Sequence, residues 1–370
     1  GPSTAGTIYA FGYTLLTGVL LNFVFGVFAT RVMIRGAAAI KALRNPWLYG
    51  AAKPGQEKAE KKPADFVSLR KKFLTFSACL MAVILLCAAV FGVHLDTEFT
   101  GGAMITLSYE GSFDQSAVQK TAAAALENTG LTLQTGENVA TGDQTLKISM
   151  PGTETVTTDQ VEALLDSLNE TYPDNNFAQL SLSNVSAAMG TKFLQKSLVA
   201  VVFALVLILL YIALRFKNIG GLTGGMMAVL ALVNDLMVVF GTFVLLRTAL
   251  DGNFIAAMLT ILGYSINDTV VIYDRIRENS ALYGKKQMSL AELVNLSVNQ
   301  SFARSLMTSI TTCLALGVVC VVSVIYRLDS IYSFAFPLLF GMVSGVYSTI
   351  CIATPLWVDW KNKKKAAKKA

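Results

Sequence analysis

The chain has 370 residues, of which 54% are hydrophobic and 15% charged, and its mean hydropathy is +0.54. This composition excludes a soluble globular protein of this length and predicts an integral membrane protein. The net charge of +6 does not indicate a nucleic-acid partner, because such a protein needs a clustered basic face with interleaved aromatic residues.

Seven apolar stretches reach or approach the length needed to cross a bilayer. A hydrocarbon core of about 30 Å requires about 20 apolar residues in a helix. The stretches cover residues 6–30, 73–93, 197–214, 219–246, 253–273, 305–325 and 331–357. The predicted fold is an α-helical multi-pass membrane bundle of seven spans.

Basic residues between the spans predict the topology, since Lys and Arg are enriched in cytoplasmic loops. They concentrate in residues 31–72, 215–217 and 275–286 and in the C-terminal tail, which all fall on one side of the seven-span arrangement. Residues 94–196 lie on the other side, with thirteen acidic residues and four lysines. We expect the linker and the tail to be cytoplasmic and residues 94–195 to be extracytoplasmic.

Residues 94–195 are predicted to form a small α+β domain. Strand patterns cover residues 103–109, 131–135, 145–150 and 177–185, and helical patterns cover 114–128 and 158–170. The order β-α-β-β-α-β is that of the ferredoxin-like fold, in which two helices cover one face of a four-stranded antiparallel sheet. The other face is left open for a neighbour.

The rest of the chain divides around this domain. Residues 1–35 hold an isolated first span, 36–70 a linker with Pro and Gly breakers, 71–93 a second span, 196–358 a five-span bundle and 359–370 a basic tail. Ser289 and Glu292 have the spacing of a capping box and predict a helix that leads into the sixth span. The chain lacks an initiator Met and begins almost directly at a span, so we expect a fragment or a processed product.

Asp268 is the first candidate functional residue, because it lies inside the apolar fifth span. On insertion scales an Asp near a helix centre costs roughly 2.5 to 3.5 kcal/mol. Arg304 on the sixth span is its expected partner, since opposite charges offset part of each other's desolvation. A purely structural ion pair is the alternative. Polar residues recur every three or four positions and predict one stripe on the sixth span: Ser297, Gln300, Ser301, Arg304, Thr308 and Thr311.

Two further polar residues lie in the spans. Asp235 follows a face of small residues on the fourth span that allows close helix approach, and structural and functional roles for it both stay open. Asn267, beside Asp268, is expected to pack or to form hydrogen bonds, since an amide does not titrate. The chain has one histidine, and its five cysteines all lie within spans, so neither a metal site nor a disulfide framework is expected.

Three motifs resemble those of SecF, the export-promoting membrane subunit of the bacterial Sec system. The run from Gly263 to Asn279, which contains Asp268, is similar to the central signature of the family. Residues 99–102, Phe-Thr-Gly-Gly, resemble its F-x-G-G motif, and residues 299–309 resemble its Arg-bearing helix. The similarity covers residues 70–357. Residues 8–35 resemble the last span of SecD, so the expected parent is a fused SecD–SecF polypeptide.

The resemblance implies membership of the resistance-nodulation-division superfamily and a role in using the proton-motive force to complete preprotein translocation across the bacterial cytoplasmic membrane. It implies that Asp268 is the proton-responsive carboxylate, that Arg304 is its basic partner and that Asp235 is a polar position of the third SecF helix. Protons are the expected coupling ion, with no bound cofactor. The expected partners are the SecD half, the SecYEG channel, the YidC insertase, unfolded preprotein and membrane lipids.

The outer domain is expected to move with the bundle through a glycine hinge formed by Phe99, Gly101, Gly102 and Gly190. Two other functions stay open: a scaffold that transduces no energy, and a proton-driven exporter of small molecules or lipids. An enzyme is not expected, because the sequence has no nucleophile elbow, metal-ligand spacing or phosphate loop.

Overall fold

A computed structural model of the chain describes residues 4–41, 44, 64–128, 130–137, 143–152 and 155–367. They belong to two units, Pro2–Pro63 and Ala64–Ala370. The described residues contain seven helices long and apolar enough to cross a membrane, and the prediction of seven spans is confirmed. These are Gly12–Ala39, Arg70–Phe91, Ala187–Arg215, Gly221–Leu246, Gly252–Tyr283, Leu290–Ile325 and Asp329–Lys364. Most of the predicted linker lies outside the described residues.

The first unit holds one candidate span. It is built from α1 (Thr4–Asn22), the π-helical η1 (Phe23–Ala29) and α2 (Thr30–Ala39). From residue 12 onward its apolar side chains are exposed or half-exposed. A helix that is apolar on all sides is stable when lipid or other helices surround it.

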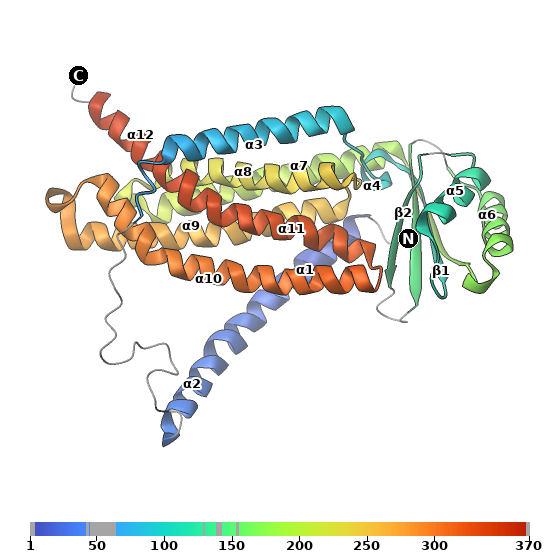
Figure 1. Cartoon of the computed structure of the whole chain (residues 1–370), viewed down its shortest axis with the longest axis horizontal. Coiled ribbons are helices and arrows are strands. Elements are labelled where there is room, and N and C mark those ends of the chain that lie inside the picture. The colour runs from blue at the N-terminus through green and yellow to red at the C-terminus, as the bar shows by residue number, and fades with distance from the viewer. Residues whose placement is uncertain are drawn as a thin grey trace. The chain divides into compact units, whose positions relative to one another are not determined.

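The second unit holds a bundle of six spans (Figure 1). They are α3 (Arg70–Phe91), α7 (Ala187–Arg215), α8 (Gly221–Leu246), α9 (Gly252–Gln287), α10 (Leu290–Ile325) and α11 (Asp329–Ser348), which continues through the π-helical η6 (Thr349–Ala353) into α12 (Thr354–Ala367). More than half of the apolar windows of α8 and of α11 is buried, against under a fifth for α3, α7 and α10. Helices α8 and α11 therefore form the centre of the bundle.

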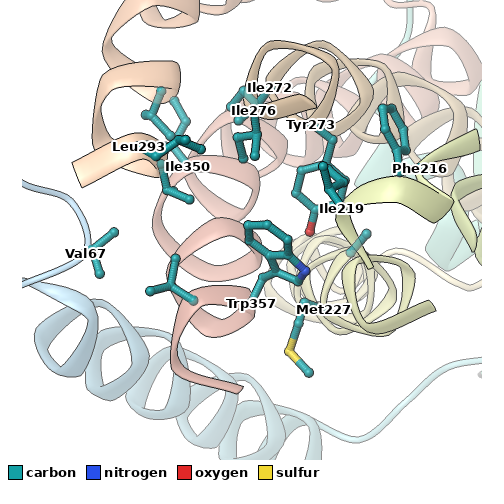
Figure 2. Close-up of a cluster of buried hydrophobic side chains, with 14 of the residues drawn as sticks. Val67, Phe216, Ile219, Met227, Ile272, Tyr273, Ile276, Leu293, Ile350 and Trp357 are labelled. Atoms are coloured by element: carbon teal, nitrogen blue, oxygen red, sulfur yellow. The ribbon is translucent and has the colours of Figure 1, made fainter. Parts of the chain in front are cut away.

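At the end of the bundle away from the α/β domain (Figure 1), α9 and α12 pack together through an apolar cluster (Figure 2). Trp357 of α12 and Tyr273 of α9 are fully buried, with ring centroids 6.0 Å apart. The Tyr273 hydroxyl donates to Gly224 O at 3.0 Å, and the ring lies 3.1 Å from where a Cβ on Gly224 would be. Val67, which precedes α3, joins the same cluster. This packing fixes α8, α9 and α12 to one another.

The α/β domain follows α3. It contains α4 (Thr97–Thr100), β1 (Gly102–Tyr109), α5 (Gln115–Ala125), β2 (Thr132–Glu137), β3 (Gln144–Pro151), α6 (Thr158–Thr171) and β4 (Ala178–Val185). The strands pair antiparallel in the order β2-β3-β1-β4, which confirms the predicted ferredoxin-like arrangement. Helices α5 and α6 cover the sheet face away from the bundle (Figure 1), over a core that includes Ile105, Leu146 and Leu164.

Side chains alternate between the two faces of a strand, so Lys147 of β3 lies on the face opposite to Leu146 and Ile148. That face is turned toward the bundle (Figure 1). The capping box of α10 also forms as predicted, with Ser289 and Glu292 each bonding the other's backbone N–H. The helix that it opens is continuous with the sixth span, over 36 residues.

Candidate functional site

The Asp235 carboxylate of α8 is wholly buried. Three serine hydroxyls donate to it: Ser344 to Oδ1 at 2.6 Å, and Ser265 and Ser348 to Oδ2 at 2.7 Å each. Ser265 belongs to α9 and the other two serines to α11, so the carboxylate ties three helices together. Hydrogen bonds to an ionised acceptor are shorter and roughly twice as strong as neutral ones. Protein donors thus satisfy this buried anion.

Close helix approach makes the serine cage around Asp235 possible. A Cβ on Gly345 of α11 would lie 3.2 Å from the Ser265 side chain, and one on Gly341 would lie 2.7 Å from Ile261 of α9. Glycine at both positions lets α11 approach α9 closely. Short hydroxyl side chains can then reach Asp235. The neighbouring Asn234 Nδ2 donates to Ser344 Oγ at 3.2 Å.

Asp268 lies on α9 and is 5% exposed. The Ser305 hydroxyl of α10 faces its carboxylate but is outside hydrogen-bonding geometry. Within the described part of the chain no ion pair under 4 Å joins Asp268 to Arg304. The guanidinium of Arg304 attracts the carboxylate through space. The structure therefore brings the two charges near each other without a contacting ion pair.

The buried polar face of α10 differs from the predicted stripe. It consists of serines at every fourth position, Ser297, Ser301, Ser305 and Ser309. Four members of the predicted stripe lie outside this buried face and are exposed on the surface of this chain: Gln300, Arg304, Thr308 and Thr311. The physical reason is that the Thr308 hydroxyl donates to Arg304 O at 2.9 Å within its own helix and needs no other partner. Small serines occupy the helix contact instead.

Polar contacts continue on both sides of Asp268 along the interface between α9 and α10. The Tyr264 hydroxyl donates to Ser309 Oγ at 3.2 Å, and Asn279 Nδ2 donates to Ser297 Oγ at 2.9 Å. Asn267 is exposed, and no described residue forms a hydrogen bond with its side chain. Asp268 thus lies in a polar seam between two helices, and Asn267 does not help to hold it in this chain.

The expected hinge motif is a tightly packed joint. Phe99 is 2% exposed and stacks on Phe193 of α7, with ring centroids 5.6 Å apart. Gly101 has a φ of +81°, and a Cβ on it would lie 2.5 Å from the backbone of Ala187. A Cβ on Gly190 would lie 2.6 Å from Gly101 N. Glycine is required at these positions by close backbone approach and, at Gly101, by the positive φ.

Gly102 belongs to the same joint and to the first strand. Its φ is +131°, and a Cβ on it would clash with Met150 O of β3.

A second contact fixes the α/β domain on the other side of the bundle end. Asp329 Oδ2, at the start of α11, accepts from Thr135 Oγ1 at 2.9 Å and from Gln115 Nε2 at 3.1 Å. The domain is therefore attached both through its first strand and through β2.

Comparison with known proteins decides the family. A family model described as protein export membrane protein SecD/SecF, C-terminal, matches residues 164–363. The SecF translocase subunit of Petrotoga mobilis is 31% identical over 83% of this chain and 99% of that protein. The chain belongs to the SecD/SecF family of protein export membrane proteins. The SecF and SecDF proteins of this family are translocase subunits of Sec-dependent protein export, which are transport proteins and not enzymes.

Fused relatives match as well. The SecDF protein of Bacillus subtilis is 31% identical over 81% of this chain and 38% of that protein. A crystal structure of SecDF from Thermus thermophilus, described as a translocon-associated membrane protein, aligns over 97% of this chain with a TM-score of 0.72 and 26% identity. A second SecDF structure, in a super-membrane-facing form, aligns with a TM-score of 0.60 and 28% identity. The chain spans less than half the length of these two solved chains.

The sequence alone did not identify the serines that surround Asp235. The only available signal was the spacing of Ser344 and Ser348, which puts both on one face of α11. It also did not identify Ser305 as the residue that faces Asp268. Serines in spans are common helix-packing residues, so their pairing with a particular carboxylate needed the three-dimensional arrangement.

Proposed function

We propose that this chain couples the proton-motive force to preprotein export through Asp268. The observation that supports the proposal is a buried carboxylate with neither a contacting cation nor a hydrogen bond of normal geometry among the described residues. Such a group is costly in a membrane and marks proton pathways in pumps and transporters. Asp235, with three donors, is a helix-joining group in this proposal.

The proposed cycle uses Asp268 and Arg304. Protonation of Asp268 removes the attraction between the two charges and lets α9 and α10 repack, and release of the proton restores the attraction. Each elementary charge that crosses the membrane supplies about 2.3 kcal/mol per 100 mV. That energy is comparable to the few kcal/mol that separate two conformations of a switching protein.

We propose that the α/β domain is extracytoplasmic and holds the emerging polypeptide, with the linker and the tail in the cytoplasm of a bacterial cell. The distribution of basic residues supports this orientation. The α/β domain is attached at the joint and at Asp329, so repacking of α9 and α11 would move it.

We also propose that the first span belongs to the SecD half. The SecF of Petrotoga mobilis and that of Alicyclobacillus acidocaldarius match 82% to 83% of this chain, whereas the SecDF structure of Thermus thermophilus aligns over 97%. A SecD half would also cover exposed apolar side chains of α10. SecYEG, the YidC insertase, unfolded preprotein and lipids are the further partners proposed.

The test is an export assay in vesicles that contain the chain with its SecD half and the SecYEG channel. An imposed proton gradient is expected to speed completion of translocation, and Asp268→Asn to abolish that stimulation. Asp274→Asn, on the same helix but half-exposed, is the matched control and is expected to retain it. Stimulation that survives Asp268→Asn would favour the scaffold function, and gradient-driven flux of a small solute without preprotein would favour the exporter.

A further inference from the structure

The α/β domain and the bundle meet where two loops pair in parallel. Leu250 N donates to His94 O at 2.8 Å, and Asp96 N donates to Leu250 O at 3.0 Å. The first loop leads from α3 into α4, and the second leads from α8 into α9. Helix α9 carries Asp268, so these paired loops link the α/β domain directly to the helix of the proposed proton site.

Four charged side chains gather beside these paired loops. They are Asp96, which caps α4, Glu98 within α4, Lys147 on β3 and Asp251, which caps α9. Lys147 Nζ lies 3.3 Å from Asp96 Oδ2 and 3.8 Å from Glu98 Oε1. The three acidic residues are 1%, 8% and 4% exposed in chain order. One partly buried cation thus pairs with two buried carboxylates and attracts the third through space.

Two of these carboxylates hold the first turn of α9. Glu98 Oε2 accepts from Gly252 N at 2.8 Å, and Asp251 Oδ1 accepts from the backbone N–H groups of Asn253 and Phe254 at 2.9 and 3.3 Å. A Cβ on Gly252 would lie 2.9 Å from Glu98 Oε2. Negative charge is favourable at a helix N-terminus. Glu98 is therefore a direct contact between the α/β domain and α9.

We propose that Asp96, Glu98, Lys147 and Asp251 form a proton-responsive latch that fixes the α/β domain to the start of α9. The latch is closed when Asp251 is protonated and Lys147 pairs with Asp96 and Glu98. It opens when all three carboxylates are ionised. The contacts alone carry this inference, whereas the use of the latch in export rests on the proposed function.

Electrostatics gives the direction of the switch. With every group ionised the latch would hold three negative charges and one positive charge, a net charge of −2. Burial raises the pKa of Asp251 to about 7, against the attraction of Lys147 and with added repulsion from Glu98 and Asp96. Burial also raises the pKa of Glu98. Burial acts to lower the pKa of Lys147, but its three acidic neighbours outweigh burial and raise the pKa above its usual value.

The sign of the pH dependence follows from these shifts. An open latch would expose Asp251 to solvent, where the pKa of an Asp is about 4. Between about pH 4 and pH 7 the closed latch therefore holds one proton more than the open latch. The closed-to-open ratio falls by up to about tenfold for each unit rise in pH and becomes constant above about pH 7. Lys147 stays charged throughout this range, so the carboxyl groups alone set the response.

Other charged residues near the paired loops are not part of the latch. His94 and Arg247 lie on the two paired loops, and Lys192 and Lys196 lie on α7, which packs on α4. Among the described residues none of the four forms an ion pair with the latch carboxylates. The Arg247 guanidinium lies over the Phe91 ring, 4.9 Å from its centroid. Strand β1, which also adjoins α4, has no charged residue.

The test measures the distance between the α/β domain and the bundle in lipid nanodiscs. Spin labels at Glu162 of α6 and Leu314 of α10, in a chain whose five cysteines are replaced, report this distance by double electron–electron resonance. From pH 8 to pH 5 the closed-to-open ratio is expected to rise by up to about a hundredfold. The double variant Glu98→Gln, Asp251→Asn keeps the hydrogen-bond acceptors and is expected to lose the response.

The control is Asp329→Asn, at the other contact between the domain and the bundle, which is expected to keep the pH response. Should the double variant fail to fold, Lys147→Met replaces it and is expected to lower the closed population more at pH 8 than at pH 5. A distance in the parent chain that is independent of pH, or an unchanged response in the double variant, would overturn the latch. No export step is involved, so this outcome is separate from the proposed role of Asp268.

Discussion

Asp235 and Asp268 are both buried carboxylates in the spans of one bundle, yet their surroundings differ. Asp235 receives three short hydrogen bonds from serines of two other helices. Asp268 faces a serine that is outside hydrogen-bonding geometry and a guanidinium that is not in contact. The comparison teaches that burial alone does not identify a working acid in a membrane bundle. The number of donors separates a group that holds helices together from one that is free to exchange a proton.

The largest expected loss of stability comes from removing the charge of Asp235. Asp235→Asn replaces an ionised acceptor of three hydrogen bonds with a neutral amide that adds two donors. We expect a loss of about 3 kcal/mol in the free energy of unfolding, because hydrogen bonds to charged groups contribute about 1.5 to 3 kcal/mol each and are only partly lost. Denaturation in mixed micelles measures this loss. Asp268→Asn, measured alongside, is expected to leave the free energy of unfolding unchanged or raised.

Two buried serines test the same comparison, because each can be changed by the loss of a single hydroxyl. Ser348→Ala removes a donor to Asp235 and is expected to cost about 2 kcal/mol. Ser305→Ala removes a hydroxyl that has no hydrogen-bond partner in the described structure, and its expected cost is below about 0.5 kcal/mol. Both side chains are at most 1% exposed, so the two variants are matched in burial. Equal losses would show that the donors around Asp235 contribute nothing special.

A smaller effect than that of Asp235→Asn or Ser348→Ala is expected in the seam beside Asp268. Tyr264→Phe removes the hydrogen bond to Ser309 between α9 and α10. We expect a loss of about 1 kcal/mol in the free energy of unfolding, typical of a neutral hydrogen bond. If the seam moves during the cycle, the same variant should change the rate of proton-stimulated export in the vesicle assay. A changed rate with unchanged stability would identify a contact that is made mainly in another conformation.

Much of the fold could be predicted from the sequence, because apolar length and period report directly on spans and strands. The seven spans, the order of the α/β domain and the Ser289 capping box were predicted correctly. The exposure of Arg304 and Thr308 was not predicted. A spacing of three to four residues identifies a stripe on a helix, but it does not show whether that stripe or the one shifted by a single residue faces another helix. The Thr308 hydroxyl bonds within its own helix, which removes the cost of facing outward.

The candidate site could be predicted only in part for a related reason. A carboxylate in an apolar span stands out in one dimension, so Asp235 and Asp268 were both identified. Their partners come from other helices, and the sequence does not say which helices adjoin. The latch is a stronger case, since Glu98, Lys147 and Asp251 come from three separate elements. Nothing in the sequence distinguishes any of these three residues from an ordinary charged residue on a protein surface.

The central claim is that Asp268, and not Asp235, exchanges a proton in the membrane. Infrared difference spectra of the chain in nanodiscs, recorded as the pH is changed, show titrating carboxyl groups through the C=O stretch of the protonated acid. In a background with Glu98→Gln and Asp251→Asn, we predict a titrating band that disappears in Asp268→Asn and persists in Asp235→Asn. A band that persists in Asp268→Asn and disappears in Asp235→Asn would contradict the account.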